Sequence, residues 1–368
     1  MISNARTSAE TMSPMKAGTA GEEKHVIGWD IGGAHLKMAQ VENGQVTHAT
    51  TVRASMWLGL HEVRTALNGL RPLFQSDATH VFTMTGELSD GFTSREAGVR
   101  GILDFIGTEF GRDDVRIYAG RSGFVDLSSA YDLGPEIASA NWHATAELSA
   151  KIRRDGLFVD MGSTTTDILA FRNGRLSNDG YSDAERLLTG ELVYTGFTRS
   201  ALIGIAERVP VRGTMTPQMN EYFANTADLG RILGTLDEAD DHYPSADRRA
   251  KSLAGSIGRI ARMVGRDSAD LDESEWIDIA RWFSEHQLRM IHDGAFRVVA
   301  KARLEPGAPV VGAGIGRPQI MQLAKRLERP YVDFGSLIPA TSEEVRDRAS
   351  KAAPAAAVAL LWSSRPRA

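Results

Sequence analysis

One sequence pattern occurs twice in this chain, at positions far apart. The stretches VIGWDIGGAHLKMAQVENGQV (26–46) and GLFVDMGSTTTDILAFRNGRL (156–176) align without a gap. Each reads as a strand, a glycine turn preceded by an aspartate, a second strand and an Asn-Gly hairpin. The pairs that keep register are Asp30 with Asp160, Gly32 with Gly162, Lys37 with Asp167, and Asn43-Gly44 with Asn173-Gly174. The repeat predicts two related domains that face each other, with a ligand between their glycine turns.

Strand-like and helix-like segments alternate along the rest of the chain, which predicts an α/β fold with mixed sheets. We expect a first domain at 25–153 and a second at 154–368, with a helical insertion at about 184–300. The last helix is a candidate to pack back on the first domain. Residues 1–24 lack an apolar core and are predicted to form a disordered tail.

The composition removes several classes of function. The 368 residues contain no cysteine, which excludes disulfides, thiolate zinc sites, iron–sulfur ligation and cysteine nucleophiles. A formal net charge of −5 argues against a general nucleic-acid binder. The longest apolar run, AAPAAAVALLW (352–362), is too short to span a bilayer. These features predict a cytoplasmic protein with no nucleic-acid or membrane partner, and they leave the oligomeric state open.

The two glycine turns carry the groups that a polyphosphate and its magnesium ion require. Glycine allows backbone N–H groups to approach an anion closely, and the second turn adds hydroxyl donors. The predicted phosphate-binding residues are Gly32, Gly33, Gly162, Ser163, Thr164 and Thr165. Asp30 and Asp160 suit hydrated Mg²⁺, and Lys37 adds a positive charge. An aspartate before glycine can also simply form a tight turn, but the repeat in register favours a binding site.

A third glycine turn, GAGIGRP, occupies 312–318. Its glycines are spaced too evenly for the dinucleotide-binding fingerprint, which argues against a Rossmann dehydrogenase. The helix that follows would present its N-terminus to an anion, so Gly312 and Gly314 are further candidates for phosphate binding. The alternative is a strand-to-helix turn with close packing.

Two segments without core periodicity, 85–98 and 184–200, are predicted as binding loops rather than ordinary solvated loops. Asn141 falls on the apolar stripe of a helix expected from Pro135 through 152, and a buried amide there needs partners. It could be a satisfied structural amide or a ligand contact. The candidate substrate-binding residues are Glu87, Asp90, Asn141, Glu191, Tyr194 and Thr195. No serine lies in a nucleophile elbow, so covalent catalysis has no support.

The motifs resemble a known superfamily. The paired DIGGAHLK and DMGSTTTD turns, with the late GAGIG turn, are similar to the acetate and sugar kinases, Hsp70 and actin. That resemblance implies two duplicated actin-like, ribonuclease H-like domains with phosphates bound in a central cleft.

A narrower resemblance is to the hydantoinase/oxoprolinase-related furanmethanamine synthases of methanofuran and methylofuran biosynthesis. The motifs that carry it are GWDIGGAHLKMA, TGELSDGF, SANWHATA, DMGSTTTDI, ERLLTGELVYTG and ARMVGRD. It extends from about residue 26 to the C-terminus. Gly91 stands where relatives often carry cysteine, which argues against a thiol role at that position.

This resemblance implies a transferase that releases pyrophosphate. The phenol oxygen of a γ-glutamyltyramine-like or tyrosine-like acceptor would displace pyrophosphate from aminomethyl-furanmethanol diphosphate, forming an ether. The implied cofactor is Mg²⁺, and the implied catalytic residues are Asp30, Lys37, Asp160 and Asp167, with Asp167 accepting the phenol proton. Three alternatives remain: an ATP-dependent small-molecule kinase, a hydantoinase- or oxoprolinase-type amide hydrolase, and a non-catalytic ATP-switched module.

Overall fold

The computed structural model describes residues 25–74 and 77–365, so the predicted tail at 1–24 lies outside the described residues. Its strands are β1 His25–Gly32, β2 His35–Glu42, β3 Gln45–Arg53, β4 Thr79–Thr85, β5 Val115–Tyr118, β6 Phe124–Asp126, β7 Gly156–Met161, β8 Thr166–Arg172, β9 Arg175–Leu176, β10 Leu192–Val193, β11 Arg208–Val211, β12 Thr214–Pro217, β13 Val310–Ala313 and β14 Tyr331–Asp333. Its helices are α1 Leu60–Leu70, α2 Arg95–Phe110, α3 Leu127–Ala130, α4 Gly134–Ile137, α5 Asn141–Arg153, α6 Asp183–Thr189, α7 Thr226–Ile232, α8 Leu253–Met263, α9 Glu273–Ala302, α10 Arg317–Arg326, α11 Phe334–Leu337, α12 Glu343–Lys351 and α13 Ala353–Ser363.

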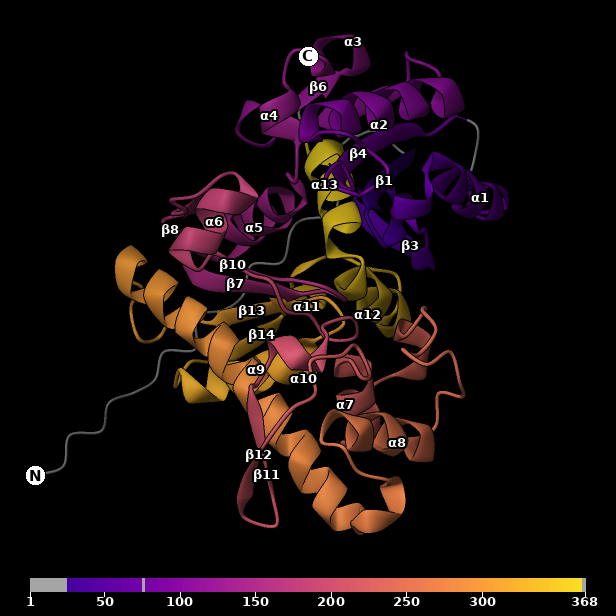
Figure 1. The fold of residues 1–368 in the computed structure, drawn as a ribbon. Coiled ribbons are helices and arrows are strands. Elements are labelled where there is room, and N and C mark those ends of the chain that lie inside the picture. The colour runs from indigo at the N-terminus through magenta and orange to yellow at the C-terminus, as the bar shows by residue number, and fades with distance from the viewer. Residues whose placement is uncertain (1–24, 75–76, 366–368) are drawn as a thin grey trace, which may run out of the picture.

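The first sheet has the strand order β3-β2-β1-β4-β5-β6 (Figure 1). β1 pairs antiparallel with β2 and parallel with β4, and β4 pairs parallel with β5. The β2–β3 hairpin turns at Asn43 and Gly44, whose φ angles are 50° and 76°. Asn-Gly suits this turn because both central residues must adopt the left-handed region.

The second sheet repeats this arrangement with the order β10-β8-β7-β13-β14 and β9 paired to β8. β7 pairs antiparallel with β8 and parallel with β13, and β13 pairs parallel with β14. Its hairpin turns at Asn173 and Gly174, with φ angles of 52° and 76°. Four consecutive strands of each sheet, β2-β1-β4-β5 and β8-β7-β13-β14, share one connectivity, which confirms an α/β fold built from two duplicated units with mixed sheets.

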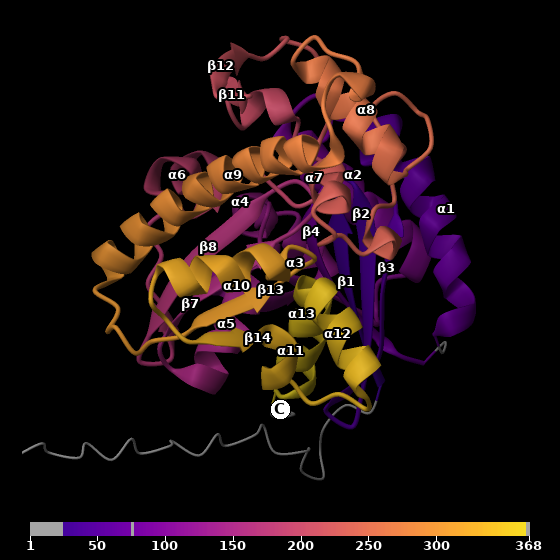
Figure 2. The ribbon, with the colours of Figure 1, turned by 90° about the horizontal axis from the view of Figure 1, so that it is seen from below.

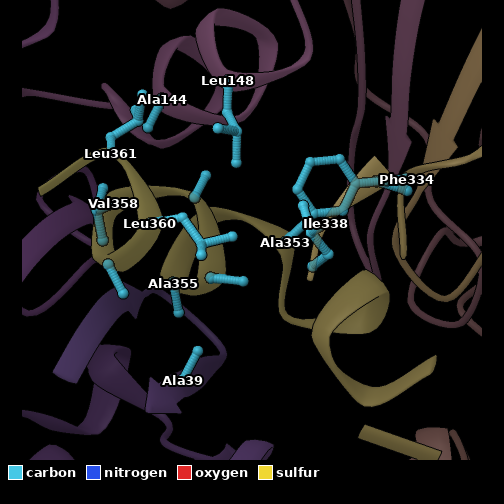
Figure 3. Packing of buried hydrophobic residues seen from close by; sticks show 14 of the residues in the cluster. Ala39, Ala144, Leu148, Phe334, Ile338, Ala353, Ala355, Val358, Leu360 and Leu361 are labelled. Atoms are coloured by element: carbon cyan, nitrogen blue, oxygen red, sulfur yellow. The ribbon is translucent and has the colours of Figure 1, made fainter. Parts of the chain in front are cut away.

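Helices α5 and α13 fill the space between the sheets. α13 contacts β1, β2, β4 and α5, and α5 contacts β7 and β8. Figure 3 shows Val358, Leu360 and Leu361 of α13 between α5 and the strand that carries Ala39. The sequence of α13, APAAAVALLWS, is apolar on all sides, as expected of a helix enclosed by protein. Within the ranges described above, no helix is both long enough and apolar enough to cross a membrane.

The insertion at about 184–300 contains α6, α7, α8 and most of α9, and also the β11–β12 hairpin, so it is not purely helical. A separate apolar core supports it, with Leu202, Val209, Ile260, Trp276 and Phe283 among its buried members. The long helix α9 begins at a capping box, in which the Asp272 side chain accepts a hydrogen bond from the Glu275 N–H. It contacts β11 and also β8, so it ties the insertion to the second sheet (Figures 1 and 2).

The helix expected from Pro135 through 152 is interrupted. It forms α4 and α5, separated by a turn in which Ser139 has a φ of 53°. Asn141 is therefore the first residue of α5 rather than part of a continuous buried stripe. Its Oδ1 accepts a hydrogen bond from the Trp142 N–H at 2.7 Å. The sequence prediction failed here because the polar partners of Ser139 come from distant segments.

Candidate active site

The glycine-turn ends of both repeated units border one cavity of about 990 Å³. Strand pairing explains why their charged residues meet: Asp30 lies opposite Lys37 across β1–β2, and Asp160 lies opposite Asp167 across β7–β8. The predicted site residues on its walls are Asp30, Gly32, Gly33, Lys37, Asp90, Asn141, Asp160, Gly162, Ser163, Thr164, Thr165, Asp167 and Tyr194. Both glycine turns therefore border the same space.

Asp30 and Lys37 form a close ion pair on the first unit. The Lys37 ammonium donates to Asp30 Oδ2 at 3.0 Å, and Asp30 is only 1% exposed. Burial alone would lower the pKa of Lys37, but the charges of Asp30 and Asp160 outweigh it and raise the pKa above its usual value. Lys37 thus stays positively charged beside the cavity. Asp30 Oδ1 is buried without a hydrogen-bond partner in the described structure.

Asp160 is the corresponding aspartate of the second unit. Burial raises its pKa to about 7, with Lys37 opposing the rise and the neighbouring Asp167 and Asp30 adding to it. Asp160 still faces the cavity, since it is 8% exposed and lines the wall. Within residues 25–74 and 77–365, no group of three or more histidine and carboxylate side chains is arranged to hold a metal by itself.

Asp167 is held by an arginine of the predicted binding loop at 184–200, for which the sequence predicted no specific role. Arg186 Nη1 donates to Asp167 Oδ1 at 2.6 Å, and Arg186 is 3% exposed. Its guanidinium also lies 4.6 Å from the centroid of the Trp142 ring. Burial raises the pKa of Asp167, while the Arg186 charge and hydrogen bond work against the rise. The carboxylate is thus both positioned and made more basic than a surface aspartate.

A polar network connects Arg186 to the first half of the chain. Arg186 Nη2 donates to Asp183 Oδ1 at 3.2 Å, and Arg95 Nη2 donates to Asp183 Oδ2 at 2.7 Å. The Ser139 hydroxyl lies 3.1 Å from the same Asp183 oxygen and 2.6 Å from Glu87 Oε1. Glu87 was predicted to bind substrate, but it is fully buried behind Ser139, and burial raises its pKa. It supports the wall of the cavity rather than lining it.

Another part of the cavity wall combines an arginine with aromatic and imidazole rings. It includes His35, Trp57, Arg199 and His242. The rings of His35 and His242 pack edge to face at 5.0 Å. Burial, followed by the charges of His242, Lys37, Arg199 and Arg53, holds the pKa of His35 well below its usual value. His35 lies inside the first glycine turn, which was a usable signal, whereas Trp57 and His242 reach the cavity only through tertiary packing.

Four further candidate residues do not line the cavity: Glu191, Thr195, Gly312 and Gly314. Glu191 accepts hydrogen bonds from the backbone N–H groups of Asp179 and Gly180, at 2.7 and 2.8 Å, and so shapes a loop. Thr195 is buried and bonds with Ser200 and Gln287. These two side chains turned inward because each satisfies buried polar groups.

Gly312 and Gly314 of the third turn also lie behind the wall. A side chain at Gly312 would meet the Tyr331 ring, and one at Gly314 would lie 2.4 Å from Asp160 Oδ1. The close-packing alternative therefore describes this turn. Gly314 acts on the site indirectly, by leaving room for the Asp160 carboxylate.

Residues 78–333 match the hydantoinase/oxoprolinase family. A curated relative from Methanocaldococcus jannaschii is 28% identical over 295 residues, which cover 79% of this chain and 86% of the relative. Another from Methanococcus vannielii is 30% identical over 169 residues, which cover 46% of this chain and 74% of the relative. Both are named as synthases of a furan-2-yl methanamine that carries a γ-L-glutamylaminoethyl-phenoxymethyl group.

Among solved structures, acetone carboxylase in a nucleotide-free form superposes with a TM-score of 0.53 at 11% identity, covering 84% of this chain and 68% of that chain. Component A of (R)-2-hydroxyglutaryl-CoA dehydratase from Acidaminococcus fermentans gives a TM-score of 0.46 at 12% identity, covering 93% of this chain and all of its own. The duplicated sheets of the present chain have the actin-like arrangement that the paired turns predict. On the family match over residues 78–333, the chain belongs to the hydantoinase/oxoprolinase family, and its two curated relatives are members named as furanmethanamine synthases.

Proposed function

We propose that this protein is a transferase that joins aminomethyl-furanmethanol diphosphate to the phenol oxygen of a γ-glutamyltyramine-type or tyrosine-type acceptor. One observation carries the proposal: both glycine turns and the charged residues Asp30, Lys37, Asp160 and Asp167 face a single cavity. The names of the two relatives supply the substrate class. In the reaction, a bond forms between the phenol oxygen and the furan methylene carbon, and the bond from that carbon to the diphosphate oxygen breaks.

The leaving group is the main charge that the protein has to stabilise, because the electron-rich furan itself stabilises positive charge on the methylene carbon. Lys37 remains charged at the cavity wall and would neutralise the departing diphosphate oxygens. The half-buried hydroxyls of Ser163, Thr164 and Thr165 and the backbone N–H groups of 163–165 would donate hydrogen bonds to the same oxygens. These contacts strengthen as negative charge develops on the leaving group, which lowers the barrier.

The carboxylates of Asp30 and Asp160 fit a magnesium ion carried by the diphosphate. Asp30 Oδ1 is a buried oxygen without a partner, and Asp160 forms no hydrogen bond or ion pair with the described residues. Protein sites commonly hold Mg²⁺ through one or two carboxylates plus substrate phosphates, so a third protein ligand is not needed. When bound, Mg²⁺ would supply positive charge to the diphosphate oxygens.

Asp167 is the proposed acceptor of the phenol proton. It lies on β8 beside Asp160, its pKa is raised by burial, and Arg186 fixes the direction of its carboxylate. A carboxylate oriented in this way can take a proton as the phenol oxygen forms its new bond. Tyr194, which is 69% exposed, and Asn141 and Asp90 lie on the wall where the acceptor would enter.

The test is to incubate the purified protein with Mg²⁺, the furfuryl diphosphate and a tyramine-type phenol, and to follow ether and pyrophosphate together. We expect equal amounts of the two products and no requirement for ATP. Asp167→Asn should lower turnover while leaving pyrophosphate binding intact. Absence of the ether, or turnover that depends on ATP, would refute the proposal and favour a small-molecule kinase.

A further inference from the structure

Arg199 is enclosed by aromatic rings from two other parts of the chain. Its guanidinium carbon lies 4.9 Å from the centroid of the Trp57 ring and 4.7 Å from that of Tyr243. Trp57 follows β3 of the first sheet, whereas Tyr243 belongs to the insertion. Arg53 packs on the same Tyr243 ring at 4.8 Å. Stacking of this kind orients a planar guanidinium and restricts its rotamers before any ligand arrives.

Among the residues that the structure describes, no carboxylate forms an ion pair with Arg199. Five lysine and arginine residues line the cavity: Lys37, Arg186, Arg199, Arg348 and Lys351. Within the described ranges, four of them form ion pairs, with Asp30, with Asp167 and Asp183, with Glu344, and with Asp237, Asp240 and Asp347 respectively. Arg199 forms no ion pair there, and its neighbour Arg53 contacts Ser55 and Tyr243 rather than a carboxylate. A fixed guanidinium without a counter-charge at a cavity wall is suited to an anionic ligand.

Backbone contacts place Arg199 on the rim of the second glycine turn. The Arg199 N–H donates to the Ser163 carbonyl at 2.9 Å, and its Nη1 lies 3.4 Å from Thr164 Oγ1. Gly196 permits this approach, because a Cβ there would lie 2.4 Å from the Thr164 nitrogen. The guanidinium is therefore attached to the same turn that would bind phosphate.

The insertion also reaches the first glycine turn. The Tyr243 hydroxyl donates to the Ala34 carbonyl in that turn, and the Tyr243 ring packs edge to face against His35 at 5.5 Å. One aromatic residue thus contacts the first turn and the arginine of the second turn. The position of Arg199 relative to both turns depends on Tyr243.

We propose that Arg199, held between Trp57 and Tyr243, binds the terminal phosphate of the diphosphate and makes the site selective for a diphosphate over a monophosphate. This inference rests on the proposed function and extends it to a residue and a specificity. The planar fork of arginine can donate two parallel hydrogen bonds to one phosphate group, which a lysine ammonium cannot do. A monophosphate bound near Lys37 and the glycine turns would not need Arg199.

Calorimetric titration of Arg199→Gln with pyrophosphate and with orthophosphate, both in the presence of Mg²⁺, tests the proposal. The variant should bind pyrophosphate about tenfold to a hundredfold more weakly, the range for a lost charge-assisted hydrogen bond. Its affinity for orthophosphate should change by less than about threefold, because other groups would make those contacts. Arg281→Gln is the matched control: Arg281 is exposed on α9, pairs with Asp278 and does not line the cavity.

Two more variants separate charge from geometry. Arg199→Lys keeps the charge but loses the planar fork, so it should show an intermediate loss of pyrophosphate affinity. Tyr243→Leu removes one stacking wall without altering any charge, and should weaken pyrophosphate binding by about threefold to tenfold. Thermal unfolding of each variant shows whether the fold is intact.

The outcomes distinguish this inference from the proposed function. If wild-type protein binds pyrophosphate and Arg199→Gln binds it equally well, the inference is wrong and the proposed function stands. Equal losses of pyrophosphate and orthophosphate affinity would also overturn it, since Arg199 would then add charge without selectivity. If wild-type protein binds no pyrophosphate at all, the proposed function itself fails.

Discussion

At the residue scale, the ion pair between Lys37 and Asp30 should contribute both to stability and to catalysis. Lys37→Met should reduce turnover on the order of a hundredfold to a thousandfold, as expected when a preorganised charge at a leaving group is removed. It should also lower the free energy of unfolding by about 1–3 kcal/mol, because the buried Asp30 carboxylate loses its charged partner. Steady-state turnover and urea unfolding measure the two effects.

The double variant Asp30→Asn with Lys37→Met separates these roles. With both charges gone, position 30 no longer carries an unpaired buried charge, so much of the lost stability should return. Turnover should stay low, because the cation at the leaving group is still missing. Recovery of turnover in the double variant would mean that Lys37 only neutralises Asp30.

The residues of the site differ in how far the sequence could predict them. Asp30, Lys37, Asp160 and Asp167 reach the cavity through local strand pairing, which the repeat encodes directly. Arg199 lies in the segment 184–200 predicted as a binding loop, but its role could not be assigned from the sequence, because its position depends on Trp57 and Tyr243, which are distant in sequence. Glu191 and Thr195 show the converse error: polar residues in an irregular segment were read as ligand contacts, but they satisfy buried backbone and side-chain groups.

His80 is a buried group whose titration should affect stability rather than activity. Its Nδ1 accepts a hydrogen bond from Trp29 Nε1 at 3.0 Å, and burial followed by the charge of Arg71 lowers its pKa to about 4. The unfolded chain takes up this proton first, near the ordinary pKa of about 6.5. The stability that neutral His80 contributes is therefore complete above that value and is lost as the pH falls toward 4.

His80→Gln should therefore make the protein less sensitive to acid. Between about pH 7 and pH 5, the loss of unfolding free energy should be smaller than in wild type by about 2 kcal/mol. Urea unfolding at the two pH values measures the difference. His61→Gln, at a side chain that is 67% exposed, is the control and should lose as much stability as wild type. An equal loss in His80→Gln would contradict the assignment.

At the element scale, the packing of α13 on β1 requires a glycine. A Cβ at Gly28 would lie 2.0 Å from the Ala355 carbonyl oxygen and 2.9 Å from Ala359 Cβ. Gly28→Ala should therefore push the helix away from the strand and cost about 1–3 kcal/mol of unfolding free energy. Thermal unfolding would show a lower melting temperature.

Gly258→Ala provides the matched comparison within a helix. Gly258 lies inside α8, and a Cβ there meets no atom within 4 Å. This change should stabilise the protein by about 0.5–1 kcal/mol, because alanine favours the helix more than glycine does. If Gly28→Ala behaved like Gly258→Ala, the close approach of α13 to β1 would be refuted.

Helices and strands, like site residues, could be predicted where local sequence determines them and not where contacts distant in sequence do. The two strand–turn–strand units are set by local alternation, glycine turns and Asn-Gly hairpins, and they form as expected. The break between α4 and α5 was not predictable from periodicity. The polar partners of Ser139, Glu87 and Asp183, lie far from it in sequence.

At the scale of the whole molecule, the proposed base depends on both halves of the chain. Asp167 is bound by Arg186, Arg186 by Asp183, and Asp183 by Arg95 and Ser139 from the first half. Because Arg186 opposes the rise in the pKa of Asp167 caused by burial, removing it should raise that pKa further. Asp167 must lose its proton to act as a base, so protonation would then inhibit the enzyme over a wider pH range.

Arg186→Gln should therefore shift the acid limb of the profile of kcat/KM against pH toward higher pH. The loss of activity should be larger on the acid side of the profile than on the alkaline side, where Asp167 is again ionised. Arg186→Lys keeps a positive charge and should shift the limb less. Arg95→Gln removes the contact between Arg95 and Asp183 but leaves the contact between Arg186 and Asp167 in place. It therefore separates a loss of stability from an effect on the pKa of Asp167. An unchanged acid limb in Arg186→Gln would assign the proton to another group, and the network would then serve only to join the two halves of the molecule.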